Sequence, residues 1–280
     1  MRTVDDYIDE AQHLVPAPAI LSKLPPLLRQ PNVDTGKVVD LISYDQSLTG
    51  NVLRVCNSAY FCPDPPVDNL QYAVVRMGFR LIYDIVVSVI FSSTLRGAQV
   101  GEYLEGNRMW EHSVTTAVAA QSIASGLLAD EQVVFTAAIL HDIGKIVLAP
   151  ALSEIRNQAA GKSIRNGFTP LEIETKLLGV DHAQVGGRLL ERWQLPEELV
   201  SAVRHHHKPS ASDGHQQLTA CVNLGDFIAY SLGHGYGHCS FDLNERDESL
   251  EILNLSSERA SQYTIQVAET LEEVKSLYGI

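Results

Sequence analysis

Apolar residues recur three and four positions apart along most of this chain, which is the spacing of one face of an α-helix. Val38, Leu41 and Ile42 form such a face, and Asp34 before them is a residue type favoured at helix N-caps. No run of five or more residues alternates apolar with polar side chains, as a half-buried strand would. We therefore expect an all-α protein.

The composition is that of a globular chain, since 45% of its 280 residues are hydrophobic and 20% are charged. The apolar stretch Leu81–Phe91 is interrupted by Asp84 and is shorter than the roughly 18 residues that a membrane span needs, so we expect no span. Acidic residues follow Met1 closely, which predicts no signal peptide and a cytoplasmic location. The net charge of -13 argues against nucleic acid and anionic membranes as partners.

The four cysteines, Cys56, Cys62, Cys221 and Cys239, show neither a CxxC pair nor the spacing of a zinc ribbon. A chain of this length buries roughly 75% of its unfolded surface and needs no disulfides to stay folded. We therefore expect free thiols in a reducing compartment and no structural metal-thiolate site.

Prolines and glycines divide the chain into segments. Five prolines lie within Pro16–Pro31, so we expect this segment to be broken into short pieces. Leu70–Gly78 is predicted as a short helix closed by glycine, and Arg80–Leu95 as a long, mostly buried helix. We expect two packed helical subdomains and an acidic helical extension, over residues 1–105, 106–235 and 236–280.

Histidines are clustered, because seven of the ten lie between residues 112 and 215. His141 and Asp142 follow a strongly apolar helix, where a buried charge needs a partner. An imidazole and a carboxylate at such a helix end can bind a metal, and the two carboxylate oxygens can bridge two cations. The alternative is a helix-terminal turn leading to Gly144. Lys145, three residues after Asp142, favours a functional site.

The other histidines each have a plainer alternative. His112 lies on an apolar helix and, taken alone, is more typical of a core histidine with one hydrogen-bond partner. His182 follows Asp181, so it equally fits an exposed neighbour of an N-cap. His206 and His207, with His205 as a less favoured neighbour, end a helix where cations are favourable, although three histidines in a row also suggest a metal.

Asp226 lies at the edge of the apolar stripe of its helix and is expected to be partly buried. Two interpretations fit such a carboxylate equally well on the sequence alone. It can be a metal ligand, or it can form a structural salt bridge to Arg188 or Arg204.

These residues, taken together, resemble the ligand set of the HD superfamily of metal-dependent phosphohydrolases, most closely its HD-GYP branch. In chain order they are His112, His141, Asp142, His182, His206, His207 and Asp226. The chain as a whole resembles the HDOD domain, an HD-related output module of bacterial signalling proteins, over roughly residues 15–232. The matching segments are Leu24-Pro25, Asp45–Leu48, Leu53–Phe61, Gln71–Ala73 and Leu140–Lys145.

The resemblance implies that the second subdomain is an HD-like helical bundle holding one or two divalent transition-metal ions, Fe, Mn, Ni or Zn, through the seven residues named. Asp142 and Lys145 would be the catalytic residues, Asp142 by sharing the ions and Lys145 by neutralising charge on phosphate oxygens. The expected reaction is hydrolysis of a phosphomonoester or phosphodiester, and the substrate is a phosphorylated or nucleotide small molecule.

Two departures from HD-GYP limit these implications. Arg108 stands where some members place a glutamate four residues before their first histidine, so we expect no third metal. Lys208 and Pro209 follow His207 in place of the Gly-Tyr-Pro sequence, so the cyclic dinucleotide substrate does not carry over.

The alternative to an enzyme is a non-catalytic signalling scaffold that acts by binding a signalling protein partner. The surface expected for this role is the proline-rich entry together with the helix that carries Arg76, Arg80 and Tyr83. The completeness of the ligand set favours metal binding and leaves both interpretations open.

Overall fold

The structure is a computed structural model that describes residues 2–11, 19–28, 30–58, 61, 66–97, 106–127, 131–158, 170–236 and 243–278. The all-α prediction is confirmed, since the described residues contain helices and no strand. The helices are α1 (Val4–Glu10), α2 (Ala19–Leu28), α3 (Thr35–Ser43), α4 (Gln46–Cys56), α5 (Leu70–Gly97), α6 (Gly106–Ala124), α7 (Glu131–Leu140), α8 (Ile143–Gln158), α9 (Pro170–Leu178), α10 (His182–Arg192), α11 (Glu197–His205), the 3-10 helix η1 (Pro209–Ala211), α12 (Gln216–Ser231), α13 (Leu243–Leu253) and α14 (Ser257–Tyr278).

Local sequence signals set several helix ends. Asp34 caps α3 by accepting a hydrogen bond from Gly36 N at 2.9 Å. Asp181 caps α10 by accepting one from Gln184 N at 2.8 Å. Gly78 has a φ of 80° and interrupts the long α5, as the predicted glycine boundary between two helices requires.

The proline-rich segment differs from expectation, because α2 runs from Ala19 to Leu28 with Pro25 and Pro26 inside it. The expected break into short pieces is wrong for this part. Each proline removes a backbone hydrogen bond, at a cost of about 3 kcal/mol inside a long helix. The burial of Leu21 and Leu24 offsets this cost. These side chains are 2% and 1% exposed, and burial of each contributes about 1.5–3 kcal/mol to stability. Packing against the core thus outweighs the local preference.

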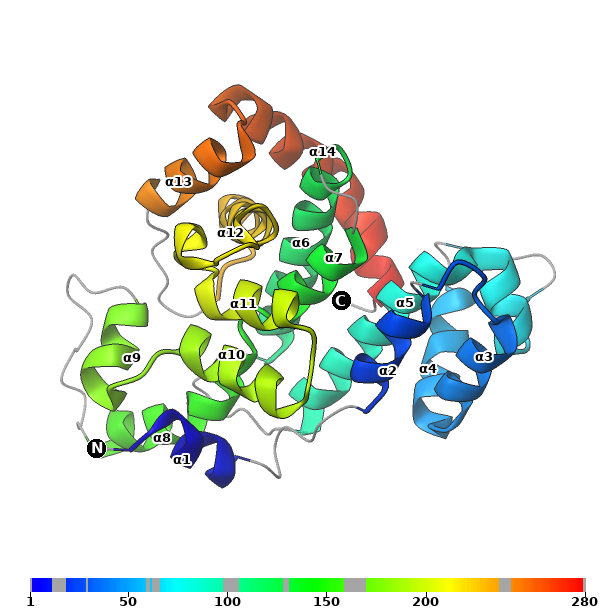
Figure 1. Ribbon diagram of the computed structural model, residues 1–280, viewed down its shortest axis with the longest axis horizontal. Coiled ribbons are helices and arrows are strands. Elements are labelled where there is room, and N and C mark those ends of the chain that lie inside the picture. The colour runs from blue at the N-terminus through cyan, green and yellow to red at the C-terminus, as the bar shows by residue number, and fades with distance from the viewer. Residues whose placement is uncertain are drawn as a thin grey trace.

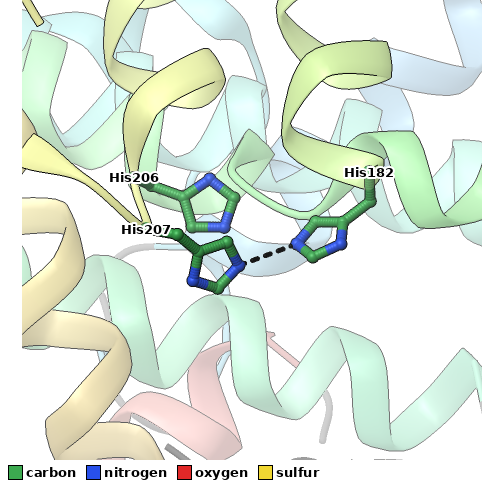
Figure 2. Close-up of side chains that lie close together, drawn as sticks. All are labelled: His182, His206 and His207. Atoms are coloured by element: carbon green, nitrogen blue, oxygen red, sulfur yellow. Dashed lines mark hydrogen bonds between the residues drawn. The ribbon is translucent and has the colours of Figure 1, made fainter. Parts of the chain in front are cut away.

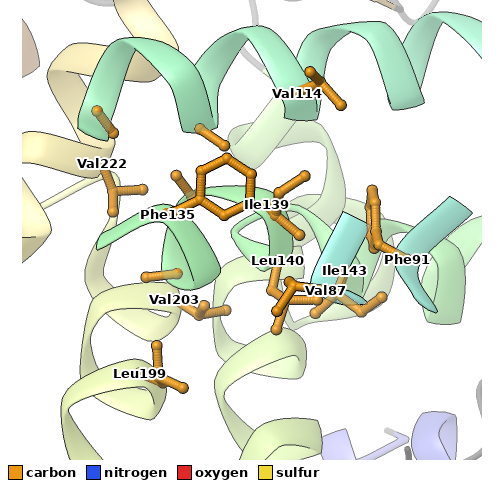
Figure 3. Close-up of a cluster of buried hydrophobic side chains, with 14 of the residues drawn as sticks. Val87, Phe91, Val114, Phe135, Ile139, Leu140, Ile143, Leu199, Val203 and Val222 are labelled. Carbon is orange, nitrogen blue, oxygen red and sulfur yellow. The ribbon is translucent and has the colours of Figure 1, made fainter. Parts of the chain in front are cut away.

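Helix α7 is the centre of the core, with every residue from Val133 to Leu140 buried. Side chains of α5, α6, α11 and α12 surround it, as Figure 3 shows for Phe135 and Ile139 and their neighbours. The stretch 131–155, which spans α7 and α8, is long and apolar enough to cross a membrane by composition, but 94% of its most apolar window is buried inside the protein. Its hydrophobicity is therefore accounted for by the core.

The helices fall into two regions along the molecule (Figure 1). Helices α2, α3, α4 and the first part of α5 lie at one end, and α6 to α13 lie towards the other. Helix α5 contacts both groups, because it packs on α3 and α4 as well as on α6 and α7. The predicted boundary at residue 105 lies outside the described residues, so the division into subdomains stays a prediction. At the C-terminal end of the chain, α13 packs on α12 and α14 packs on α6.

The surface expected for a signalling partner is only partly available. Tyr83 is 2% exposed, and its hydroxyl forms a 2.7 Å hydrogen bond with Thr136 in α7. The expectation that Tyr83 lies on an exposed face is wrong, since its ring belongs to the core. Arg76 is exposed and its guanidinium lies 5.8 Å from the ring centroid of Tyr72. Arg80 pairs with Glu131.

Two of the four cysteines, Cys56 and Cys221, are free thiols buried in the core. Burial raises the pKa of the Cys56 thiol to about 11 and that of Cys221 to about 12. Both therefore remain protonated and unreactive at neutral pH. Cys62 and Cys239 lie outside the described residues.

Candidate metal centre

The seven candidate ligands come from separate segments and converge on one buried centre. His112 lies on α6, His141 and Asp142 form the turn between α7 and α8, and His182 begins α10. His206 and His207 form the turn after α11, and Asp226 lies within α12. All are buried except His207, which is half-buried.

Two glycines permit the close helix contacts that bring these segments together. A Cβ on Gly144 would lie 2.0 Å from the carbonyl oxygen of His182, so the start of α8 can approach the start of α10 only without a side chain there. A Cβ on Gly225 would lie 2.7 Å from the carbonyl oxygen of Thr116, where α12 crosses α6. This second contact places Asp226 beside His112.

One group of ligands consists of His112, His141 and Asp226. His112 Nε2 lies 3.0 Å from Asp226 Oδ1 and 3.3 Å from His141 Nε2. His141 Nε2 lies 3.8 Å from the same Asp226 oxygen. Two imidazole nitrogens and a carboxylate oxygen at these distances can converge on a single cation.

A second group consists of His182, His206 and His207. Figure 2 shows the three rings facing one another, with a 3.0 Å contact between His182 Nε2 and His207 Nε2. One nitrogen from each ring lies within 4.8 Å of the others. These residues meet although His206 lies 24 positions after His182 in the sequence. The plainer expectation for His182, an exposed neighbour of the N-cap, is wrong because its side chain is 1% exposed.

Asp142 lies between the two groups and presents a different oxygen to each. Its Oδ2 lies 3.3 Å from His141 Nε2. Its Oδ1 lies 3.1 Å from His182 Nε2 and 3.9 Å from His206 Nε2. Lys145 Nζ donates a 2.7 Å hydrogen bond to Oδ2. The carboxylate therefore has the position that a bridge between two cations requires.

The imidazole rings are oriented by acceptors behind them. The Nδ1 of His141 lies 2.7 Å from the carbonyl oxygen of Ala138, and that of His206 lies 2.8 Å from the carbonyl oxygen of Val203. His112 Nδ1 lies 3.2 Å from the carbonyl oxygen of His234. A proton on Nδ1 satisfies each carbonyl and leaves the Nε2 lone pair directed at the centre, as in metal-ligating histidines.

His182 has a carboxylate behind it. Glu174 Oε2 lies 2.6 Å from His182 Nδ1 and accepts a 2.8 Å hydrogen bond from His182 N. Burial lowers the pKa of His182, but the charge of Glu174 and the hydrogen bonds with Asp142 and Glu174 together outweigh this effect and raise the pKa to about 9. A metal bound at His182 Nε2 would therefore displace a proton.

Three buried polar atoms at the centre have no hydrogen-bond partner, which is costly unless another group binds them. They are Asp142 Oδ1, His206 Nε2 and Asp226 Oδ1. Burial raises the pKa of Asp142, but the charges of Lys145 and His141 hold it well below the usual range. Burial, with nearby His207, holds the pKa of His206 well below its usual range. An anionic carboxylate and a neutral imidazole are the forms that bind a cation, so these residues fit a metal ion.

The alternative partners predicted for Asp226 are wrong. Arg188 pairs with Asp5 at 2.9 Å and with Glu191 at 3.0 Å. Arg204 pairs with Glu191 at 2.7 Å. The arginines thus stabilise contacts around α10, while Asp226 faces His112.

Two residues at the centre, Glu174 and Tyr236, could not be predicted from the sequence, and the less favoured candidate His205 lies outside both groups of ligands. Glu174 and Tyr236 contact the centre, but neither belongs to a motif, and each reaches it only through the packing of distant segments. His205 is half-buried and belongs to none of the metal-capable groups found among the described residues.

Comparison with known proteins places this chain in a family. Residues 14–209 match the HDOD domain. An uncharacterized protein of Treponema pallidum (strain Nichols) is 26% identical over 279 residues, which cover 98% of this chain and 52% of that protein. The chain thus spans about half the length of this curated relative.

Several crystal structures share the fold. An HDOD domain protein of unknown function from Geobacter sulfurreducens has a TM-score of 0.78 at 22% identity, covering 98% of this chain and 96% of that one. A candidate signal transduction protein from Marinobacter aquaeolei VT8 has a TM-score of 0.76 at 21% identity, covering 97% and 60%. A candidate phosphohydrolase from Shewanella amazonensis SB2B has a TM-score of 0.70 at 20% identity, covering 98% and 97%. The match over most of its length shows that this chain belongs to the HDOD domain family.

Proposed function

We propose that this chain is a metal-dependent phosphohydrolase of the HDOD family, with two divalent transition-metal ions shared by Asp142. The observation that carries the proposal is the position of Asp142, whose two oxygens face two separate histidine groups. Imidazole and carboxylate donors suit Fe, Mn, Ni or Zn. When bound, such ions polarise a phosphate group and supply a hydroxide nucleophile at neutral pH.

The chain itself supplies charge and orientation to this reaction. Lys145 lies beside the bridging carboxylate, where its ammonium can neutralise phosphate oxygens as negative charge develops. Asp142, held by Lys145, keeps one oxygen towards each group of histidines. Glu174 fixes the ring of His182. Because these groups are buried, their electrostatic interactions are screened less than they would be in water.

The burial of the centre favours a second function. In this alternative the chain is a signalling module that acts by contact with a partner protein. His112, His141 and His206 are 0% exposed, and Lys145 is 6% exposed. A buried metal site can stabilise one conformation of the chain and thereby control a binding surface elsewhere. The likeness in fold to the candidate signal transduction protein of Marinobacter aquaeolei supports this alternative at the level of fold only.

The two functions are distinguished by a rate measurement. The Mn²⁺-loaded full chain is tested for hydrolysis of an artificial aryl phosphodiester and of an aryl phosphomonoester. We expect slow turnover by the wild type, none by Asp142→Ala and a rate reduced by about 10²–10³-fold in Lys145→Ala, the range found for loss of one stabilising group. Lys37→Ala, which removes an exposed lysine from α3, is the matched control and should keep the wild-type rate. Equal rates for wild type and Asp142→Ala would exclude catalysis at this centre and favour the signalling module.

A further inference from the structure

Tyr236 covers the candidate centre from the segment that follows α12. Its hydroxyl donates a hydrogen bond to Asp142 Oδ2. Its ring centroid lies 4.8 Å from Lys145 Nζ and 5.0 Å from the ring centroid of His112. The side chain is 3% exposed. One tyrosine therefore contacts the bridging carboxylate, the phosphate-binding lysine and a histidine of the first group.

Tyr236 and Lys145 donate to the same carboxylate oxygen. Lys145 Nζ donates at 2.7 Å to Asp142 Oδ2, and Tyr236 Oη donates to that oxygen as well. A carboxylate oxygen has two lone pairs, so these two bonds occupy Oδ2, while Oδ1 has no hydrogen-bond partner. For Oδ2 to accept another group, the hydroxyl of Tyr236 has to leave. The ring of Tyr236, whose centroid lies 4.8 Å from Lys145 Nζ, has to move before a phosphate group can approach that ammonium.

The backbone beside Tyr236 is held in place by α6. Arg108 Nη2 donates a 2.8 Å hydrogen bond to the carbonyl oxygen of Gly235, and Glu111 lies 3.0 Å from His234 Nδ1. Gly235 itself is packed closely, because a Cβ there would lie 2.4 Å from the Cδ1 atom of Tyr230. The least costly movement that uncovers the centre is therefore a rotation of the Tyr236 side chain.

We propose that Tyr236 is a displaceable cap on this centre, whose side chain, held by its hydroxyl to Asp142, fills the space beside Lys145 that a phosphate group takes. This inference rests on the proposed function, because it names the step by which a phosphate gains access to the same site. The side chain of Tyr236 excludes other molecules from the centre until an anion of sufficient affinity for Lys145 replaces it. Tyr236 therefore controls access to the centre, and phosphate should bind more tightly when its hydroxyl is removed.

The first test uses the metal-free full chain and labels accessible histidines with diethyl pyrocarbonate. We expect Tyr236→Ala to raise the labelling rates of His112 and His141 several-fold, measured by mass spectrometry at a temperature where circular dichroism shows each variant folded. Tyr263→Ala is the matched control, since Tyr263 is a buried tyrosine within α14, and its labelling rates should equal those of the wild type. Equal rates for the wild type and Tyr236→Ala would overturn the cap.

The second test measures the binding of inorganic phosphate to the Mn²⁺-loaded chain by calorimetry. Tyr236→Phe removes only the hydroxyl and should bind phosphate about 2- to 10-fold more tightly than the wild type, the range that one displaced hydrogen bond represents. Unchanged or weaker binding would show that the hydrogen bond from the hydroxyl to Asp142 does not hold the side chain in place against phosphate, and the cap would be overturned. Failure of the wild type to take up Mn²⁺ would contradict the proposed function instead, and the labelling test would then decide the cap by itself.

Discussion

Asp84 buries a carboxyl group between α5 and α6. Gln121 Nε2 donates a 3.1 Å hydrogen bond to its Oδ2, while Oδ1 has no partner. Burial raises the pKa of Asp84 to about 7, although the hydrogen bond from Gln121 and the charge of Arg80 lower it, and Glu131 adds a further increase. The folded chain therefore holds a proton here that the unfolded chain releases near pH 3.8.

The pH dependence of stability follows from this difference. Because the folded pKa is raised, the contribution of Asp84 is most favourable below pH 3.8 and is lost as pH rises to about 7. The full loss is on the order of 4 kcal/mol. Asp84→Asn removes the titration, so its stability relative to the wild type, from urea unfolding, should be higher at pH 8 than at pH 5. The same relative stability at both values would contradict the assignment.

Glu174 is expected to act on metal affinity through His182. Glu174→Gln keeps an oxygen that can accept from His182 Nδ1 but removes the negative charge that makes the imidazole a better ligand. The affinity for Mn²⁺, measured by competition with a chelator, should fall about 10- to 100-fold. Glu172→Gln changes an exposed glutamate on the same helix and should leave the affinity unchanged. Equal affinities in the two variants would show that Glu174 does not orient the ligand.

The contact between α8 and α10 gives the clearest test among the helices. Gly144→Ala would place a Cβ 2.0 Å from the carbonyl oxygen of His182, so the two helix starts would have to separate. We expect a loss of stability of about 1–3 kcal/mol, as in overpacked cores, together with weaker metal binding. Gly50→Ala in α4 has open space around its Cβ and should instead stabilise the chain by about 0.5–1 kcal/mol in urea unfolding. Similar effects of both changes would contradict the close contact.

Sequence patterns predicted what is local in these helices. The N-cap at Asp34 and the interruption at Gly78 depend on residues within a few positions, and each was found where predicted. Helix α2 was not predicted, because the burial of its leucines depends on distant parts of the chain. The positions of Glu174 and Tyr236 at the centre were missed for the same reason, since packing between segments determines both.

The whole molecule brings its candidate ligands together from α6, the α7–α8 turn, α10, the end of α11 and α12. Helices α2 to α5 contribute none of them, although α5 packs on α6 and α7. A centre assembled from so many segments exists only in the folded chain, so a metal that binds it stabilises the fold. At a free metal concentration of 100 times Kd this stabilisation is about 2.7 kcal/mol.

Elemental analysis of the full chain, purified without chelator, tests the shared metal centre most directly. We predict close to two transition-metal ions per chain for the wild type, and a clear loss of metal in His141→Ala and Asp142→Ala. Asp247→Ala, which changes an exposed aspartate on α13, should keep the full metal content. A wild-type chain free of transition metal, or a metal content unaffected by His141→Ala and Asp142→Ala, would contradict the account.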